Sequence, residues 1–321
     1  MKKFLILFCT IGALAAAQRS VLVEAFTSTT CPYCPYANAA SEWLVDSMAD
    51  TVSVIQYMSG LSGSDATVRA NFYGVSGVPD VWFTGAEDAV GSYSDTARDY
   101  RRYKGFVNNW KYVMAPLIIR DVIATVDAGG NGSISCVIDI ESTLPSTDPD
   151  PRVFCAITER GVFGDGRYNR YIMRDIISSP TGDSLLATQA GDTQNFSWSF
   201  STGSWNTDSL NATIFVQSMD SKLVFQSKQV QIYPTGTGED RASGPVKDQL
   251  RPGTERLILN ISTKSQVKVV ICDPTGRTVA RIYSGEMSKG QHAFKMPDLR
   301  PGAYIAVAAT ERGVVSAGFV R

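Results

Sequence analysis

A pair of cysteines between an extended segment and a helix constrains this chain more than any other feature. The apolar, β-branched run that begins at Val21 favours a strand, and a short polar turn follows it up to Thr30. Cys31-Pro32-Tyr33-Cys34 comes next, and the alanine-rich segment 36–45 predicts a helix. The predicted strand therefore ends at two sulfurs that open a helix.

Cysteines at the start of a helix are suited to redox chemistry. The unpaired N–H groups of the first turn and the positive end of the helix dipole favour a thiolate at Cys31. Pro32 suits a first helical position, whereas Pro35 either loosens the first turn or marks the first regular residue. We expect Cys31 to be the more exposed sulfur and the attacking thiolate. Cys34 would lie behind it and resolve a mixed disulfide.

The composition narrows the class of protein. A length of 321 residues predicts about two domains, or three small ones, and 44% hydrophobic residues exclude global disorder. A formal net charge of −1 argues against nucleic acid as the main partner. We expect no cofactor and no metal, because zinc usually takes four ligands and the chain has no second Cys-x-x-Cys pair and a single histidine, His292. A purely structural disulfide between Cys31 and Cys34 is the main alternative to a redox pair.

The N-terminus has the pattern of a secretory signal peptide. Lys2-Lys3 is the positive start, residues 4–16 form the apolar core, and small residues end the segment at Ala17. We predict a signal peptide over residues 1–17 with cleavage before Gln18. No run in the chain is long enough to span a bilayer comfortably, so we expect no transmembrane segment in the mature chain. The expected location is extracytoplasmic: the periplasm, the cell surface or the medium.

Residues 18–112 are predicted to form a strand, a helix, a strand, a helix, two strands and a helix. The second helix, over 65–73, is expected to end at Gly74. Pro79 enters an apolar strand directly after a glycine turn, which is awkward for a central strand. A cis bond between Val78 and Pro79 would account for its position.

The Cys-Pro-Tyr-Cys after a strand, together with Gly77-Val78-Pro79 at a later strand entry, resembles the thioredoxin fold. The resemblance implies that Cys31 is the nucleophile and Cys34 the resolving cysteine. It also implies that Pro79 is a cis-proline packed against the sulfurs and that Val78 presents backbone groups to a bound substrate. The opening Val-Leu-Val-Glu-Ala-Phe-Thr, followed by Cys-Pro-Tyr-Cys-Pro, more narrowly resembles a bacterial thioredoxin-fold family named after a twenty-eight-kilodalton outer-membrane protein. That family pairs its thioredoxin-like unit with a β-rich domain.

Two positions depart from the pattern of thioredoxin-like proteins. Thr30 stands where an aromatic residue often precedes the first cysteine. Ala25 stands where many members carry a buried acid. Glu24 is one residue earlier, and a shift of one residue turns a strand side chain to the other face. The sequence therefore argues against Glu24 as a proton shuttle.

Residues 113–234 alternate between polar and apolar positions, with frequent turns, which predicts an antiparallel β-sandwich. The segment 161–193 interrupts this pattern as a functional loop or a helical excursion. Cys136 and Cys155 both lie on apolar strand faces. If their strands pair as a hairpin, the two sulfurs would face each other in a structural disulfide. Buried free thiols are the alternative, and the pattern does not choose between them.

Residues 235–253 have the composition of a linker, and residues 254–321 form a third unit of short strands. The strands are expected at Arg256–Ile261, Gln266–Cys272, Thr278–Ser284, Gly290–Met296, Ala303–Ala309 and Val314–Val320. This series resembles the C-terminal sorting domains of type nine secretion and related immunoglobulin-like modules, which implies outer-membrane secretion machinery as a partner. An ordinary sandwich cap is the alternative. The expected architecture is an α/β thioredoxin-like domain followed by two mostly antiparallel β-sandwich domains.

Two functions from different classes fit these patterns. The first is an exported thiol–disulfide oxidoreductase that acts through Cys31 and Cys34 on the thiols or disulfides of other exported proteins. The second is a surface binding or structural protein in which the thioredoxin-like unit is a redox-inert scaffold. The direction of electron flow does not follow from the sequence, because such couples range from strong reductants to strong oxidants.

Overall fold

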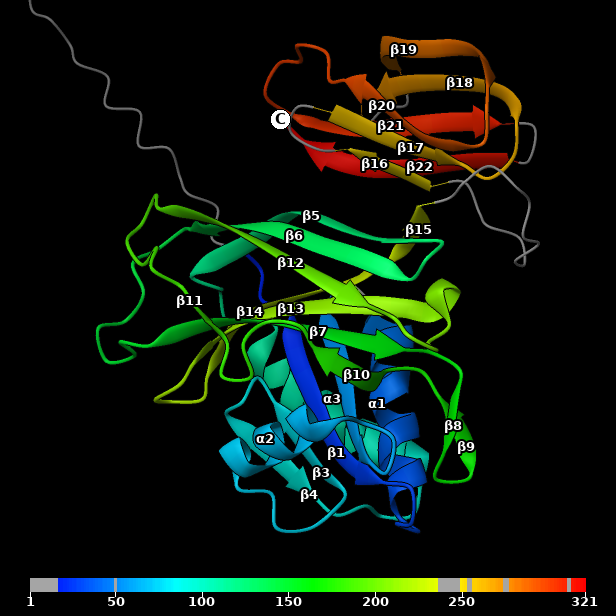
Figure 1. The fold of residues 1–321 in the computed structure, drawn as a ribbon. Coiled ribbons are helices and arrows are strands. Elements are labelled where there is room, and N and C mark those ends of the chain that lie inside the picture. The colour runs from blue at the N-terminus through cyan, green and yellow to red at the C-terminus, as the bar shows by residue number, and fades with distance from the viewer. Residues whose placement is uncertain (1–16, 49–50, 236–248, 253–255, 274–276, 311–312) are drawn as a thin grey trace, which may run out of the picture. The chain divides into compact units, whose positions relative to one another are not determined.

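The computed structural model describes residues 17–48, 51–235, 249–252, 256–273, 277–310 and 313–321, which Figure 1 draws in colour. The chain divides into two compact units, Met1–Glu239 and Asp240–Arg321. The boundary between the units falls inside the predicted linker, 235–253. Most of that linker and all of the predicted signal peptide except Ala17 lie outside the described residues.

The first unit is mostly β-sheet with few helices (Figure 1). Its N-terminal elements are β1 (Val21–Ser28), α1 (Cys34–Met48), β2 (Val52–Ser59), α2 (Ser64–Tyr73), β3 (Asp80–Phe83), β4 (Glu87–Val90) and α3 (Thr96–Trp110). This is the predicted order of strands and helices for residues 18–112. Strand β1 is parallel to β2 and antiparallel to β3, and β3 is antiparallel to β4. None of the described helices is long and apolar enough to cross a membrane.

Alternate residues of β1 face opposite sides of this sheet. Val21, Val23 and Ala25 pack in one core with residues of α1 and α3. Leu22 and Phe26 pack in a second core with residues of α2. The sheet is therefore covered on both faces, which explains why nearly every residue of β1 is buried.

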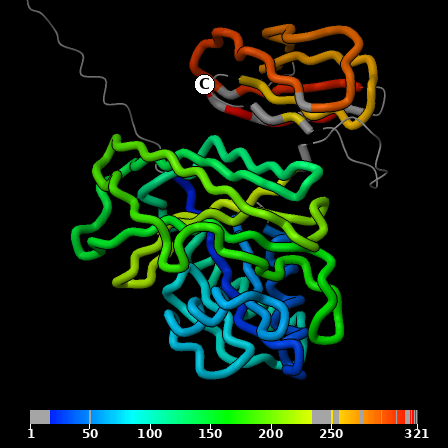
Figure 2. Tube along the Cα trace, in the orientation of Figure 1, coloured from blue at the N-terminus to red at the C-terminus, as the bar shows by residue number. Residues whose placement is uncertain are grey.

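The sheet continues into the second half of the unit. The elements there are β5 (Leu117–Asp127), β6 (Asn131–Ile140), β7 (Pro151–Glu159), β8 (Val162–Gly164), β9 (Arg167–Asn169), β10 (Ile172–Ile176), β11 (Asp183–Ser184), β12 (Thr193–Ser201), the 3-10 helix η1 (Thr207–Ser209), β13 (Leu210–Ser218), β14 (Val224–Gln231) and β15 (Tyr233–Thr235). Strand β10 pairs in parallel with β2 at Ile172 and Gln56. One sheet of order β14-β13-β7-β10-β2-β1-β3-β4 thus joins the segments 18–112 and 113–234, and Figure 2 shows the green chain returning beside the blue one.

A second sheet, of order β12-β6-β5-β15, covers the β7-β13-β14 part of the long sheet. The core between them is apolar and includes Leu117, Ile134, Ile138, Val153, Ile157, Leu210, Ile214 and Phe225. Two packed sheets are therefore present in this part of the chain, and one of them is shared with the N-terminal elements. The interrupting segment 161–193 contains the short strands β8 to β11 and no helix.

A hydrogen-bonded network around a buried ion pair connects the two halves of the first unit. Arg69 Nη2 on α2 donates to Glu24 Oε1 on β1 at 2.7 Å, and neither side chain is more than 2% exposed. The hydroxyls of Tyr57 and Tyr73 donate to the same carboxylate at 2.9 and 2.5 Å. Arg69 Nη1 donates to Gln217 Oε1 on β13 at 2.8 Å. One hydrogen-bonded network therefore ties β1, β2 and α2 to the sandwich.

The charges in this network balance each other without water. Burial lowers the pKa of Arg69, but the Glu24 carboxylate, together with Tyr73 and Tyr57, more than offsets this and leaves the pKa above its usual value. Burial first, and then Glu24, raise the pKa values of Tyr57 and Tyr73 well above the ordinary range. The guanidinium thus stays charged and both phenols stay neutral, which is the state that a buried carboxylate requires.

The second unit consists of β16 (Gln249–Pro252), β17 (Arg256–Ile261), β18 (Ser265–Cys272), β19 (Thr278–Met287), β20 (Gly290–Lys295), β21 (Ala303–Thr310) and β22 (Gly313–Val320). Its two sheets have the orders β16-β17-β20 and β19-β18-β21-β22. They enclose an apolar core that includes Leu257, Leu259, Val267, Val269 and Ile271. The six strands expected after residue 254 are confirmed, and the largest difference is that β19 runs on to Met287.

We expect Arg69→Met to lower the free energy of unfolding of the first unit by about 3–5 kcal/mol, because it leaves the Glu24 carboxylate buried without its partner. All five tryptophans lie before residue 206, so the urea dependence of tryptophan fluorescence reports this unit alone. The matched control is Asp46→Asn, which breaks the exposed Arg170–Asp46 pair and should cost about 0–1 kcal/mol. Equal losses for the two variants would contradict the role given to the buried pair.

Candidate active site

Cys31 and Cys34 form a disulfide at the start of α1, with their Cα atoms 5.4 Å apart. Cys31 is half-buried, whereas Cys34 is completely buried. The expected order of exposure is therefore confirmed. The N–H of Cys34 donates to Cys31 Sγ at 3.1 Å. A backbone N–H of the first helical turn that donates to a sulfur in this way favours the thiolate form of that sulfur.

The turn before the helix explains why Cys31 reaches the surface. Strand β1 ends at Ser28, whose carbonyl accepts a hydrogen bond from the Cys31 N–H at 3.3 Å. The Ser28 hydroxyl also accepts from the Thr30 N–H at 3.3 Å. These bonds fold four residues into a tight turn, so α1 begins at Cys34 and not within the polar segment.

A second loop meets the disulfide from a distant part of the sequence. The Val78–Pro79 peptide bond is cis, as the sequence predicted. The carbonyl oxygen of Val78 lies 3.7 Å from Cys31 Sγ, although the two residues are 47 positions apart. Val78 is 41% exposed and Tyr33 is 53% exposed, so apolar side chains border the accessible sulfur. The structure thus brings together Cys31, Cys34, Val78 and Pro79.

Glu24 lies on the sheet face that is packed against α2, with its carboxylate held by Arg69, Tyr57 and Tyr73. Ala25, the next residue, faces α1. The sequence predicted that a shift of one residue turns Glu24 to the other face of the strand, and the structure agrees. The Glu24 side chain belongs to the buried network on the far side of the sheet.

The structure adds two polar residues beside the dithiol helix that the sequence did not single out. Asn38 follows Cys34 by one helical turn on α1, and its Nδ2 donates to Asp165 Oδ2 at 2.8 Å and to Thr27 Oγ1 at 3.4 Å. Asp165 lies in the turn between β8 and β9. Its Asp-Gly dipeptide indicates a hairpin turn, but no local pattern shows that this hairpin reaches α1.

Cys136 and Cys155 are both buried and free. The hairpin that would place them face to face does not form, because β6 pairs with β5 and β12, whereas β7 pairs with β10, β11 and β13. Both sulfurs instead lie in the core between the two sheets. Burial raises the pKa of Cys136 to about 12 and that of Cys155 well above its usual value. Two neutral thiols in an apolar core are unreactive.

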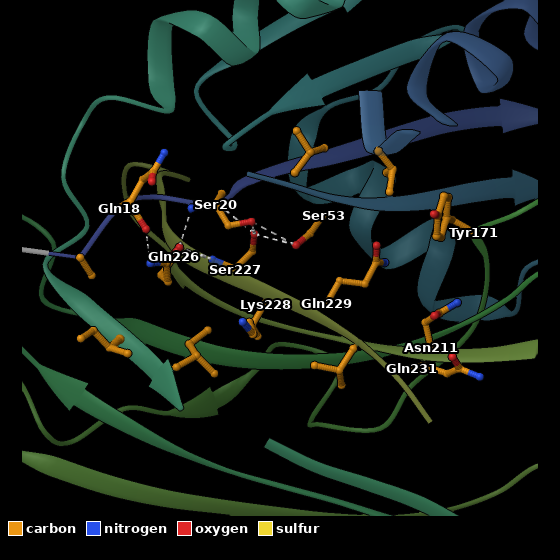
Figure 3. Close-up of a pocket in the computed structure, with 16 residues that line it drawn as sticks. Gln18, Ser20, Ser53, Tyr171, Asn211, Gln226, Ser227, Lys228, Gln229 and Gln231 are labelled. Carbon is orange, nitrogen blue, oxygen red and sulfur yellow. Dashed lines mark hydrogen bonds between the residues drawn. The ribbon is translucent and has the colours of Figure 1, made fainter. Parts of the chain in front are cut away.

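A polar cavity of about 480 Å³ lies at the other end of β1 (Figure 3). The hydroxyls of Ser20, Ser53 and Ser227 meet there, 3.1–3.4 Å apart. Asn211 also lines the cavity, and its buried Nδ2 has no hydrogen-bond partner. The eight residues of β1 separate this cavity from the disulfide, a span of about 25 Å at roughly 3.3 Å per residue. This cavity and the predicted site are therefore different places.

No metal centre is assembled elsewhere in the described part of the chain, where no group of three or more His, Cys, Asp or Glu side chains is placed to hold an ion. The disulfide and its neighbours offer one accessible sulfur, one shielded sulfur and the Val78 backbone carbonyl beside the first.

No family model matches the chain, and no curated protein matches it significantly. Among solved structures, HBP35 of Porphyromonas gingivalis is similar at a TM-score of 0.57 and 16% identity, over 95% of this chain and 99% of that one. A protein of Agrobacterium tumefaciens, AGR_C_4864, matches at 0.45 and 17% identity, over 71% of this chain and 100% of its own. A domain of the outer membrane lipoprotein Omp28 of P. gingivalis matches at 0.29 and 16% identity, over 40% of this chain and 96% of the domain. At these identities the HBP35 likeness establishes a shared fold.

We expect unreduced, denatured protein treated with iodoacetamide to carry the label at Cys136, Cys155 and Cys272, while Cys31 and Cys34 appear as one disulfide-linked peptide. The reason is that only Cys31 and Cys34 are bonded among the described cysteines. Without denaturant, Cys136 and Cys155 should resist the reagent, because burial keeps both thiols protonated. Peptide mass spectrometry reads out both results, and a peptide linking Cys136 to Cys155 would show that the two thiols are bonded after all.

Proposed function

We propose that this protein is an exported thiol–disulfide oxidoreductase whose reactive centre is Cys31 and Cys34. The observation that carries the proposal is the disulfide at a strand–helix junction with the cis Val78–Pro79 loop against it. The half-buried Cys31 sulfur lies 3.7 Å from the Val78 carbonyl oxygen, and this sulfur would attack the disulfide of a client chain.

The element order supports a thioredoxin-like module over residues 18–112. The resemblance at Cys31-Pro32-Tyr33-Cys34 implies a particular arrangement of elements. It implies two parallel strands and an antiparallel hairpin, with α1 and α3 on one face of the sheet and α2 on the other. In this proposal the module is not a free-standing domain. Its sheet continues through β10 into the sandwich, so the dithiol is carried by a larger rigid body than the module alone.

The chemistry is disulfide exchange. The Cys31 thiolate attacks one sulfur of a client disulfide, the client S–S bond breaks, and a mixed disulfide forms while the other client sulfur leaves as a thiolate. The Cys34 thiolate then attacks Cys31 Sγ, the Cys31–Cys34 bond forms, and the second client thiolate leaves and takes up a proton. Two electrons pass from the dithiol to the client. The same steps in reverse oxidise a client dithiol.

Cysteine-containing exported proteins are the proposed substrates. The backbone of Val78 would pair with the client chain next to its cysteine, and the exposed rings of Tyr33 and Tyr36 would contact apolar client side chains. The predicted signal peptide over residues 1–17 supports export. The resemblance of residues 254–321 to type nine sorting domains supports passage through outer-membrane secretion machinery to the surface or the medium.

The second candidate is a binding or structural protein in which the disulfide is inert. The polar cavity beside Ser20 and Asn211 favours this alternative, because it offers hydrogen-bonding groups at the opposite end of β1 from the Cys31–Cys34 disulfide. The two candidates differ in one measurable property, which is catalysis that depends on Cys31.

We expect the mature protein to catalyse insulin reduction by dithiothreitol or oxidation of a dithiol peptide, and Cys31→Ser to reduce both rates to the uncatalysed background. Cys34→Ser should trap the mixed disulfide, because the sulfur that resolves it is gone. Cys272→Ser, which removes a thiol of the second unit, is the matched control and should keep full activity. If the wild-type protein shows no Cys31-dependent rate of either disulfide reduction or dithiol oxidation, the oxidoreductase proposal is wrong and the binding protein remains as the candidate.

A further inference from the structure

The resolving step raises a problem of proton transfer that the dithiol does not solve by itself. Cys34 has no exposed surface, so water cannot reach its sulfur directly. A thiol is a poor nucleophile until it loses its proton. A neighbouring group must therefore accept that proton when Cys34 attacks the mixed disulfide, and this question arises only if the proposed function holds.

Two carboxylates of the N-terminal elements are already committed elsewhere. Glu24 is held by Arg69 on the opposite face of the sheet. Glu42, two turns beyond Cys34 on α1, is 3% exposed and accepts hydrogen bonds from the side chain of Arg167, from the backbone N–H of Arg170 and from the amide of Gln56. The Glu42 carboxylate is therefore already occupied by a guanidinium and two further donors.

Asp165 is in a different situation. Its carboxylate reaches α1 from the β8–β9 turn and accepts only amide hydrogens, from Asn38 Nδ2 at 2.8 Å and Asn169 Nδ2 at 3.0 Å. Asn38 and Cys34 are four residues apart on one helix, so their side chains are neighbours. The Asn38 amide thus holds the Asp165 carboxylate beside the helical turn that carries the buried sulfur.

The charges around Asp165 favour a carboxyl group that exchanges protons. Burial raises its pKa above the ordinary value, and the carboxylate of Glu42 on α1 acts in the same direction. The amides of Asn169 and Asn38 and the guanidinium of Arg167 on β9 oppose that shift without cancelling it. A base whose pKa moves toward neutrality is better matched to a thiol at physiological pH.

The hairpin that carries Asp165 is fixed to α1 independently of this side chain. Arg167 Nη2 pairs with Glu42 Oε2 at 2.5 Å, and Arg170 Nη2 pairs with Asp46 Oδ2 at 2.8 Å. Asp165 and Gly166 both have positive φ angles, 48° and 85°. Asn tolerates this conformation as well as Asp does. An Asp165→Asn change should therefore preserve the turn and its position.

We propose that Asp165 is the proton acceptor for Cys34 in the resolving step. The Cys34 thiol gives its proton to the Asp165 carboxylate, directly or through one water, and the resulting thiolate attacks Cys31 Sγ. The Cys31–Cys34 bond forms, the client thiolate leaves, and it is protonated as Asp165 returns to its charged form. A residue of the sandwich half of the chain thereby completes the chemistry of the N-terminal half.

The test is a single turnover of the reduced, full-length mature protein with glutathione disulfide, sampled by acid quench and mass spectrometry between pH 5 and 10. The glutathione adduct on Cys31 reports the first step, and its decay reports the resolving step. Asp165→Asn should slow the decay about 100-fold at pH 7 and leave formation of the adduct unchanged. The deficit should shrink toward pH 10, where thiols lose their protons without help from a carboxylate. Asp165→Glu, which restores a carboxylate, should recover part of the rate.

Asp88→Asn, an exposed change on β4, is the matched control and should follow the wild type at every pH. Should Asp165→Asn fail to fold by circular dichroism, Asn38→Ala gives the same test by releasing the carboxylate. Decay rates of the variant that overlay those of the wild type would overturn the assignment of Asp165 while the oxidoreductase proposal stands. A wild-type protein that forms no adduct at Cys31 would instead overturn the proposed function itself.

Discussion

The ion pair of Glu24 and Arg69 is the interaction on which the rest of the first unit depends. A carboxylate without access to water is tolerable only with a full set of donors, and here α2 and β2 supply them. The ring centroids of Phe72, Tyr73, Phe154 and Phe215 lie 4.9–5.3 Å from the Arg69 guanidinium carbon. Because two of these rings come from β7 and β13, both halves of the unit contribute to the surroundings of the pair.

This coupling changes what the dithiol is attached to. The long sheet passes from β4 to β14 without a break, so the helix that carries Cys34 shares one framework with the sandwich. The β8–β9 hairpin uses that framework to reach α1, where Arg167 and Arg170 bind the acidic side chains of Glu42 and Asp46. The surroundings of the buried sulfur are therefore built by both halves of the chain.

The two ends of β1 serve different purposes in this arrangement. At its C-terminal end, the tight turn after Ser28 presents Cys31 beside the Val78 carbonyl. At its N-terminal end, Ser20 contributes to a polar cavity whose side chains are mostly bonded to each other. The first end has an accessible sulfur, and the second has a donor, Asn211 Nδ2, that the protein itself leaves unpaired.

The sequence by itself determined the local features of this protein. The strand, turn and helix around Cys31 and Cys34, the cis bond at Pro79, the helix end at Gly74 and the strands of the second unit all follow from short-range patterns, because φ/ψ preferences and side-chain periodicity act within a few residues. Tertiary structure alone decided which strands became neighbours. Alternation shows that Cys136 and Cys155 face inward, but it does not show that they lie in opposing sheets. Likewise, an Asp-Gly turn specifies a hairpin, and only the pairing of β10 with β2 brings Asp165 to the helix of the dithiol. Long-range pairing depends on the packing of the whole sheet, which no local segment encodes.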